Sequence, residues 1–264
     1  MRTVDINCQY HIGDYLLQQN YNIKLVKQEY PHLIINFWSP PEFREELDAH
    51  VPNHLKDRIV YKPYGGGDRP AGSVESWIGR DGWQTRRKET KWPYCMWDEQ
   101  YIEFFDLLSR DLGVQNPIKT PYDFLFDTPT LLQPNVLTKH YDYLVLNSQP
   151  MSGQCSFFSA QAFKDLVKAL HDSGSTVVTT ERTEVEDVPA TRDYMLKLID
   201  IGNLSTQVDN IIGVHTGTWH NTMNIFNIDK VKRRFVVNDH RVNFTHPSCI
   251  YADSFEMIYK TLGL

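Results

Sequence analysis

The sequence lacks a long apolar run. No segment approaches the roughly 18 consecutive apolar residues of a membrane-spanning helix, and the opening residues MRTVDINCQYHIGD hold no apolar stretch of the kind found in signal peptides. Cysteine is also scarce. Cys8, Cys95, Cys155 and Cys249 lie far apart with no C-x-x-C pair, which argues against a zinc site and against a disulfide framework. We therefore expect a cytoplasmic protein with no membrane span and with reduced thiols.

Positive charge is in short supply as well, because 33 acidic residues outnumber 27 basic ones and the net charge is −6. A chain with this balance has no general attraction for a phosphate backbone, so bulk nucleic-acid binding is disfavoured. The one visible basic cluster, residues 80–91, has Trp77, Trp83 and Trp92 around it. A solvated loop is the simpler interpretation of this cluster, and a contact surface for a polyanion or an acceptor is the alternative.

Several catalytic signatures are missing. The chain has no G-x-G-x-x-G, no P-loop and no G-x-S-x-G, which excludes the usual signatures of dinucleotide oxidoreductases, P-loop enzymes and α/β hydrolases. His50 and His54 stand four residues apart, but Pro52 between them breaks the helix that would put both on one face. We expect no metal site and no cofactor.

The chain does contain an alternation of short apolar runs with longer amphipathic ones, which predicts strands alternating with helices. The predicted strands are residues 2–8, 33–38, 59–62, 141–147, a run ending at 179–180, 210–214 and 234–237. The predicted helices are residues 15–30, 42–50, 98–112, 159–171, 191–198, 204–207, 219–226 and 254–262. This order predicts an α/β protein with parallel sheets.

Two aperiodic segments interrupt the alternation. Residues 64–93 are rich in glycine, tryptophan and charge, which predicts a long loop. Residues 117–134 are rich in proline and threonine and favour a link between two lobes. We therefore predict two Rossmann-like lobes, residues 1–135 and 136–264, whose strand ends face a central cleft.

The most informative segment is residues 211–220, with the sequence IIGVHTGTWH. A buried strand runs here into a turn rich in threonine and glycine and then into a helix. Such a turn leaves backbone N–H groups at a helix start where they bind an anionic phosphate, and Gly217 permits close approach. An ordinary turn with Thr216 or Thr218 as the N-cap is an equally good interpretation.

A second segment, His11-Ile12-Gly13-Asp14, follows the first strand and opens the first helix. An acidic residue at this position is more often only a cap or a partner of the helix dipole. In a cleft, the same carboxylate takes a proton from an attacking hydroxyl. One base and one anion-binding turn are the minimum equipment for transferring a sugar from a phosphate to a hydroxyl.

Together, HIGDYLL at residues 11–17 and STQVDNIIGVHTGTWH at residues 205–220 resemble the heptosyltransferase-type family (ADP-heptose:LPS heptosyltransferase-like) of GT-B glycosyltransferases. The resemblance implies a GT-B fold, with Asp14 as the general base and Gly13 as a close-approach glycine. It also implies that Thr216, Gly217, Thr218 and His220 lie around the donor phosphates. His11, beside the base, and His215, where many members of the family have an acidic residue, are also predicted to bind substrate.

Other predicted substrate-binding residues follow two strands of the second lobe. Ser148 and Gln149 come after the first of these strands, and Thr180, Glu181 and Arg182 come after the next. The chain has no Asp-x-Asp, the metal-binding pair of the other major glycosyltransferase fold. These features favour transfer without a metal.

We therefore expect a glycosyltransferase that uses a nucleotide-sugar donor. The acceptor is left open between a glycan, a lipid-linked and a modified-nucleotide acceptor. Two other hypotheses remain: a non-catalytic GT-B-like module that binds a nucleotide or glycan, and a glycosyltransferase acting on modified DNA, for which residues 80–91 are the support.

Overall fold

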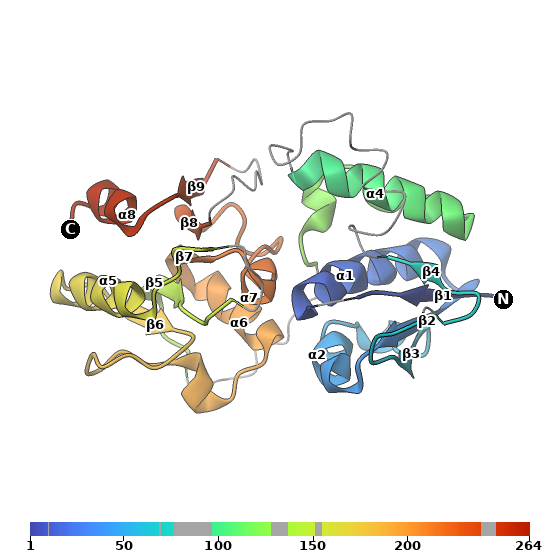
Figure 1. Ribbon diagram of the computed structural model, residues 1–264, viewed down its shortest axis with the longest axis horizontal. Coiled ribbons are helices and arrows are strands. Elements are labelled where there is room, and N and C mark those ends of the chain that lie inside the picture. Colours follow the sequence, from blue (N-terminus) through green and yellow to red (C-terminus); the bar gives the residue numbers. More distant parts are fainter. Residues whose placement is uncertain (10, 69, 77–96, 128–136, 151–154, 239–246) are drawn as a thin grey trace. The chain divides into compact units, whose positions relative to one another are not determined.

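The computed structural model describes the chain except residues 10, 69, 77–96, 128–136, 151–154 and 239–246 (Figure 1). It divides into two compact units, Met1–Pro129 and Thr130–Leu264. The predicted boundary between residues 135 and 136 lies outside the described residues, as do the basic cluster at 80–91 and most of the predicted loop at 64–93.

The first unit contains a four-stranded parallel sheet with the strand order β3-β2-β1-β4. Its elements are β1 (Arg2–Asn7), α1 (Ile12–Glu29), β2 (Leu33–Ser39), a 3₁₀ turn (Pro41–Phe43), α2 (Arg44–Ala49), a second 3₁₀ turn (Asn53–Leu55), β3 (Ile59–Pro63), β4 (Val74–Glu75), α4 (Trp97–Leu112) and a third 3₁₀ turn (Pro121–Phe124). The predicted strands and helices of this half are present. The sequence did not predict β4, because two residues are too few for a periodic signal.

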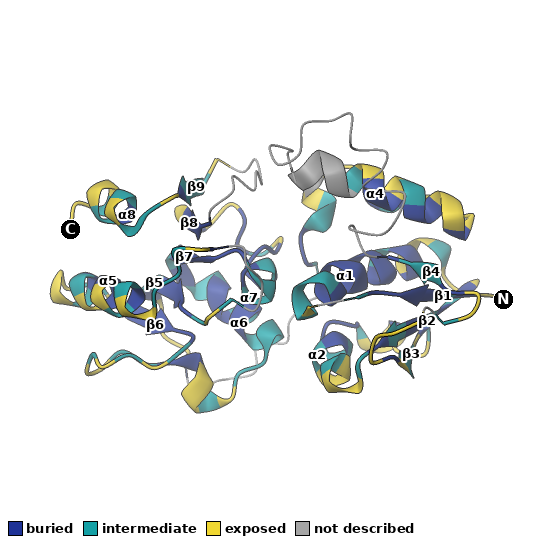
Figure 2. Cartoon of the chain, viewed as in Figure 1, coloured by how far each residue is buried: buried dark blue, intermediate teal, exposed yellow. Residues whose placement is uncertain are grey.

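Helix α1 is the central helix of the first unit, and Figure 2 shows most of its length in the colour of buried residues. The ring of Tyr21 stacks on Phe105 of α4 with centroids 4.7 Å apart, and its hydroxyl pairs with Ser109 Oγ at 2.8 Å. On another side, Gln19 Nε2 donates to Tyr61 Oη of β3 at 2.9 Å. Since buried polar groups are stable only when hydrogen-bonded, these contacts fix α1 within the unit.

The first part of the predicted link at residues 117–134 belongs to the first unit. Asn20 Nδ2 of α1 donates to the carbonyl of Phe124 at 2.8 Å, and Lys27 Nζ pairs with Asp127 Oδ2 at 3.0 Å. Leu125 and Phe126 are buried. The segment up to Asp127 therefore packs within the first unit, because a stretch rich in proline can still bury apolar side chains against a helix.

The second unit contains a five-stranded parallel sheet with the strand order β6-β5-β7-β8-β9. Its elements are β5 (Tyr141–Leu146), α5 (Ala160–Asp172), β6 (Val177–Thr179), a 3₁₀ turn (Thr191–Tyr194), α6 (Leu198–Leu204), another 3₁₀ turn (Ser205–Gln207), β7 (Val208–Val214), α7 (Gly217–Asn221), β8 (Arg233–Val237), β9 (Cys249–Ala252) and α8 (Phe255–Leu262). Relabelled within the unit, the order is 2-1-3-4-5, which is that of a flavodoxin-like Rossmann variant.

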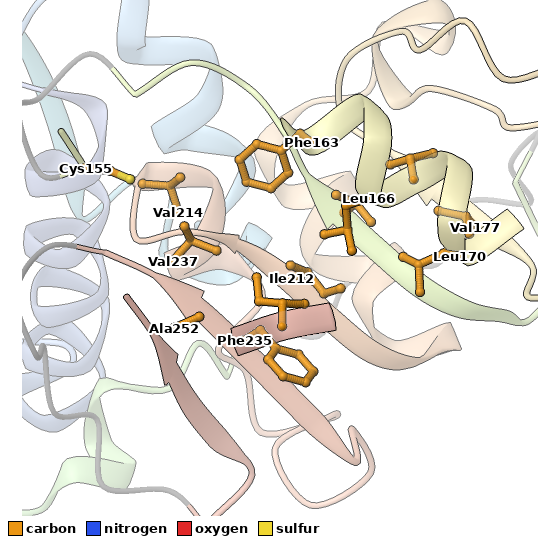
Figure 3. Packing of buried hydrophobic residues seen from close by; sticks show 13 residues of the cluster. Cys155, Phe163, Leu166, Leu170, Val177, Ile212, Val214, Phe235, Val237 and Ala252 are labelled. Carbon is orange, nitrogen blue, oxygen red and sulfur yellow. The ribbon is translucent and has the colours of Figure 1, made fainter. Parts of the chain in front are cut away.

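One face of this sheet packs against α5 and α8. Phe163 and Leu166 of α5 meet Ile212 of β7 and Phe235 of β8 in a cluster of buried side chains (Figure 3), and Ile258 of α8 belongs to the same cluster. The spacing of Phe163, Leu166, Val167 and Leu170 gives α5 one apolar side, as expected for a helix that covers a sheet.

Two predicted helices of the second unit are wrong in extent. The helix predicted at residues 191–198 is a 3₁₀ turn, Thr191–Tyr194, that stops before Met195, whose φ of 51° is left-handed. Helix α6 begins only at Leu198. The helix predicted at residues 219–226 ends at Asn221. After it, Asn224 Oδ1 accepts from the amide of Phe226 at 3.1 Å, so the side chain replaces the helical hydrogen bond.

Within the described residues, no helix is both long and apolar enough to cross a membrane.

Gly213 of β7 allows a close approach to β5, and the first prediction concerns this contact. A Cβ at position 213 would stand 2.5 Å from Leu146 Cβ, which no rotamer change relieves. We expect Gly213→Ala to lower the free energy of unfolding by about 1–3 kcal/mol through overpacking. Urea denaturation of the full chain measures this change.

Gly65→Ala is the matched control, because an added Cβ there meets nothing within 4 Å. Equal stability of the two variants would contradict the proposed close packing of β5 and β7.

Candidate functional site

The polar residues of interest lie at the carboxyl ends of the parallel strands. The strand order reverses between β1 and β4 in the first unit, and between β5 and β7 in the second. In open parallel sheets, ligands bind outside the carboxyl ends at such switch points. The two segments chosen from the sequence, the β1–α1 turn and the β7–α7 turn, each occupy one of these places in its own unit.

In the β1–α1 turn, Asp14 is the third residue of α1 and caps the helix. The backbone N–H of His11, the N-cap residue, donates to Asp14 Oδ2 at 3.3 Å. The capping role that the sequence suggested is therefore present. It uses one oxygen of the carboxylate.

Asp14 is a stronger base than a free aspartate. Burial raises the pKa of its carboxyl above the usual value, and the hydrogen bond from the His11 backbone offsets part of this rise. Desolvation disfavours the charged form, so this carboxylate binds a proton more tightly than a solvated aspartate does. This change suits a group that must accept a proton from a hydroxyl.

Buried contacts of Tyr15 fix the β1–α1 turn in place. Tyr15 Oη donates to the carbonyl of Cys8 at 2.7 Å, and its ring packs against Phe37 and Phe43 with centroids 5.9 and 5.3 Å away. Cys8 is fully buried, and burial raises the pKa of its thiol. A buried neutral thiol is inert, so Cys8 acts in packing.

In the β7–α7 turn, backbone donors are left open. Thr216 is the N-cap of α7, with extended backbone and no side-chain cap bond. The first intrahelical bond runs from the amide of His220 to the carbonyl of Thr216 at 3.1 Å. Across the described part of the chain, the amides of Gly217, Thr218 and Trp219 make no hydrogen bond. The threonine hydroxyls thus leave these donors to a ligand.

Helix α7 has only five residues, so its dipole is small and the individual amides carry the attraction for an anion. Its position is fixed by α6. A Cβ at Gly202 would stand 2.8 Å from the carbonyl oxygen of Asn221, so α6 and α7 touch through their backbones. Asn224 Nδ2 also donates to the carbonyl of Gly202 at 3.2 Å.

His215 and His220 lie side by side at this turn, with ring centroids 4.6 Å apart and an interplanar angle of 80°. Burial lowers the pKa of His215 to about 4. Burial, together with the neighbouring His215, lowers the pKa of His220 well below its usual value. Both imidazoles are therefore neutral near pH 7, and toward any anion they would offer hydrogen bonds and no positive charge.

A third cluster joins the carboxyl ends of β5 and β6. Ser148 Oγ lies 3.0 Å from Thr180 Oγ1 and 3.2 Å from Glu181 Oε1. The other carboxylate oxygen, Glu181 Oε2, accepts from Arg192 Nη1 at 2.6 Å. The structure thus brings three of the predicted residues together and adds Arg192, which the sequence did not indicate.

The other two residues predicted here do not join this cluster. Gln149 is exposed. Arg182 is exposed and its Nε pairs with Asp193 Oδ1.

Asn147 is a second residue of this cluster that the sequence analysis missed. It is buried, and its side-chain amide bonds to Thr180 and Glu181. The available signal was a polar residue directly after a buried parallel strand. Among the described residues, no group of three or more His, Cys, Asp or Glu side chains is placed to hold a metal ion.

Comparison with known proteins gives no matching family model and no matching curated protein. Solved structures do match. The E. coli heptosyltransferase WaaC with ADP-2-deoxy-2-fluoro heptose aligns over 99% of this chain and 99% of its own, at 11% identity and a TM-score of 0.59. The E. coli ADP-heptose LPS heptosyltransferase II aligns over 99% and 98%, at 12% identity and a TM-score of 0.54.

A glycosyl transferase of family 9 from Veillonella parvula also aligns, over 99% of this chain and 89% of its own, at 10% identity and a TM-score of 0.55. At these identities the likeness establishes the fold. The fold is that of the GT-B glycosyltransferases of the heptosyltransferase type, so the fold class expected from the sequence is confirmed.

The buried histidine pair generates a prediction about stability and pH. The folded-state pKa of His215, about 4, lies below the usual histidine value of 6.5. The unfolded chain therefore binds more protons as the pH falls from 7 to 5, and stability decreases over this range. For one such residue the decrease is about 2 kcal/mol. Urea denaturation at pH 7 and pH 5 measures it.

We expect His215→Gln to remove about this part of the pH dependence, because glutamine does not titrate. His54→Gln is the control for a histidine-to-glutamine change at an exposed position. An unchanged slope in His215→Gln would show that His215 is solvated and free to protonate.

Proposed function

We propose that the protein is a glycosyltransferase that moves a sugar from a nucleoside-diphosphate sugar to an acceptor hydroxyl. The observation that most supports this proposal is the β7–α7 turn at a switch point of the sheet. Three consecutive backbone amides there, from Gly217 to Trp219, make no hydrogen bond to the described residues. Open amides at such a place suit a diphosphate. The shared fold supports the proposal, because E. coli WaaC, at a TM-score of 0.59, was solved with ADP and with an ADP-heptose analogue.

In this proposal the second unit holds the donor. The amides of Gly217, Thr218 and Trp219 donate to the diphosphate, where negative charge increases as the sugar leaves. His215 and His220 add hydrogen bonds as neutral imidazoles. Ser148 and Glu181, at the ends of β5 and β6, offer acceptors for donor hydroxyl groups.

The first unit supplies the base. The acceptor oxygen attacks the anomeric carbon and the bond from this carbon to the phosphate oxygen breaks. The electron pair of that bond leaves with the nucleoside diphosphate, and the acceptor proton passes to Asp14. A carboxyl pKa raised by burial favours this proton transfer. We infer that no divalent metal takes part, and full activity after treatment with EDTA is the expected result.

Nucleotide binding is the most direct test of the proposal. We expect ADP to bind the full chain and to raise its melting temperature in a thermal-shift assay, with UDP, GDP and CDP as comparisons. Donor hydrolysis, measured next, separates an enzyme from a binding module. Binding of ADP without hydrolysis or transfer of any ADP-sugar offered would favour the module, and no binding of any nucleotide would contradict the proposal as a whole.

The role of Asp14 generates a further prediction. We expect Asp14→Asn to lower the transfer or hydrolysis rate at least about a hundredfold, because an amide cannot accept the proton. ADP affinity should change little. Rates under saturating donor, together with calorimetric titration of ADP, measure both effects.

Asp123→Asn is a matched control. Asp123 also caps a helical turn, accepting from the Thr120 amide at 2.7 Å, within the same unit. The control should keep full activity. Unaltered turnover in Asp14→Asn would refute the assignment of the base while leaving donor binding intact.

A further inference from the structure

Asn147 contacts both residues that follow β6. Its Oδ1 accepts from the Thr180 amide at 3.1 Å, from Thr180 Oγ1 at 3.0 Å and from the Glu181 amide at 2.8 Å. Its Nδ2 donates to the Glu181 carbonyl at 3.1 Å. Four hydrogen bonds from one buried side chain therefore fix the backbone of the β6 end against the β5 end.

The same bonds decide where the hydroxyl hydrogen of Thr180 points. Thr180 Oγ1 gives its one hydrogen to Asn147 Oδ1, and its two lone pairs accept from the amides of Asn147 and Ser148 at 3.0 and 3.2 Å. Ser148 Oγ lies 3.0 Å from Thr180 Oγ1 and 3.2 Å from Glu181 Oε1, so its one hydrogen is shared between these two acceptors.

Glu181 is consequently held at both carboxylate oxygens. Ser148 donates to Oε1 and Arg192 to Oε2, while Asn147 holds the backbone on either side of the side chain. A carboxylate has about four acceptor positions, so two are left for outside donors. Hydroxyl groups are the natural donors for these positions, because a second anion would be repelled.

The ends of β6 and β7 lie close enough together for a single nucleoside diphosphate to reach both. β6 and β7 flank β5, so their carboxyl ends are separated by about 10 Å, twice the spacing of neighbouring strands. A nucleoside diphosphate with its phosphates on the β7–α7 turn places its ribose a few ångströms away, within reach of the β6 end.

From these contacts we propose that Asn147 is a positioning residue that aims the Glu181 carboxylate at the hydroxyl groups of the donor nucleotide. Asn147 does not touch the ligand itself. This inference rests on the proposed function, and it adds the residue that makes the β5–β6 edge selective for a ribose diol.

The test compares ADP with 2′,3′-dideoxy-ADP, which lacks both ribose hydroxyls. Titration calorimetry on the wild-type chain should show a loss of roughly tenfold to a hundredfold in affinity for the dideoxy compound, as expected for hydrogen bonds to a charged group. Asn147→Ala should weaken ADP binding to the level of the dideoxy compound. It should leave the affinity for dideoxy-ADP and for inorganic pyrophosphate unchanged.

If Asn147 had only a structural role, its removal would lower the affinity for all three ligands alike. The ratio of the affinities for ADP and dideoxy-ADP is therefore the decisive readout. Asn210→Ala is the matched control, because Asn210 also links neighbouring strands, donating to the Asp142 carbonyl at 3.0 Å, but from the other end of β7. It should keep the wild-type ratio. Asn147→Asp retains the acceptor oxygen and loses the donor to Glu181, so it should fold and give an intermediate ratio.

Two results would overturn the proposal, and they differ in meaning. A wild-type ratio in both Asn147 variants would refute the positioning role while leaving the glycosyltransferase proposal intact. A wild-type chain that binds neither ADP nor pyrophosphate would remove the proposed function itself, and the role of Asn147 with it.

Discussion

The register between β5 and its two neighbours is the constraint on which the second unit depends. Leu146 lies opposite Gly213 of β7, and the missing side chain at 213 lets the two strands approach. On the other side, Val145 lies opposite Thr179 of β6. The strands therefore end level with one another, and Asn147, Thr180 and His215 leave the sheet at one edge. A shift by one residue would turn each of these side chains to the opposite face.

Much of the fold could be predicted from the sequence because its strands are buried. β5 and β7 are nearly continuous apolar runs, and such runs mark parallel strands covered on both faces. Prediction from the sequence failed where an element is too short to give a periodic pattern, or where a side chain replaces a backbone hydrogen bond. β4 has two residues, and α7 ends early where Asn224 takes the amide of Phe226.

The candidate site was predicted unevenly for a similar reason. Asp14 and the β7–α7 turn are local features, so their position after a strand and at the start of a helix could be predicted from nearby residues alone. Asn147 acts on residues 33 and 34 positions away, and only the pairing of β5 with β6 brings them together. The neutrality of His215 was also invisible, because the pKa of an imidazole depends on burial by residues distant in sequence.

Charge in the second unit follows a consistent pattern. Arg192 and Arg182 lie beside the β6 end, but each pairs with a carboxylate, Glu181 and Asp193 respectively. The histidines at the β7–α7 turn are neutral. A diphosphate there would thus be bound mainly by backbone amides, whose positions are fixed by the packing of α7 on α6 and do not change with pH. Preorganised dipoles of this kind stabilise a leaving phosphate without reorganising during the reaction.

Asp14 and Asp123 both cap helical turns of the first unit, and their capping bonds differ in length. Asp123 Oδ2 accepts from two amides, of Lys119 and Thr120, at 2.8 and 2.7 Å. Asp14 accepts from the His11 amide at a longer 3.3 Å. A weaker cap costs α1 little, because the packing of Tyr15 and Tyr21 already fixes the helix. The capping bond therefore offsets only part of the rise in the Asp14 pKa that burial causes, which is compatible with the proposed role as a base.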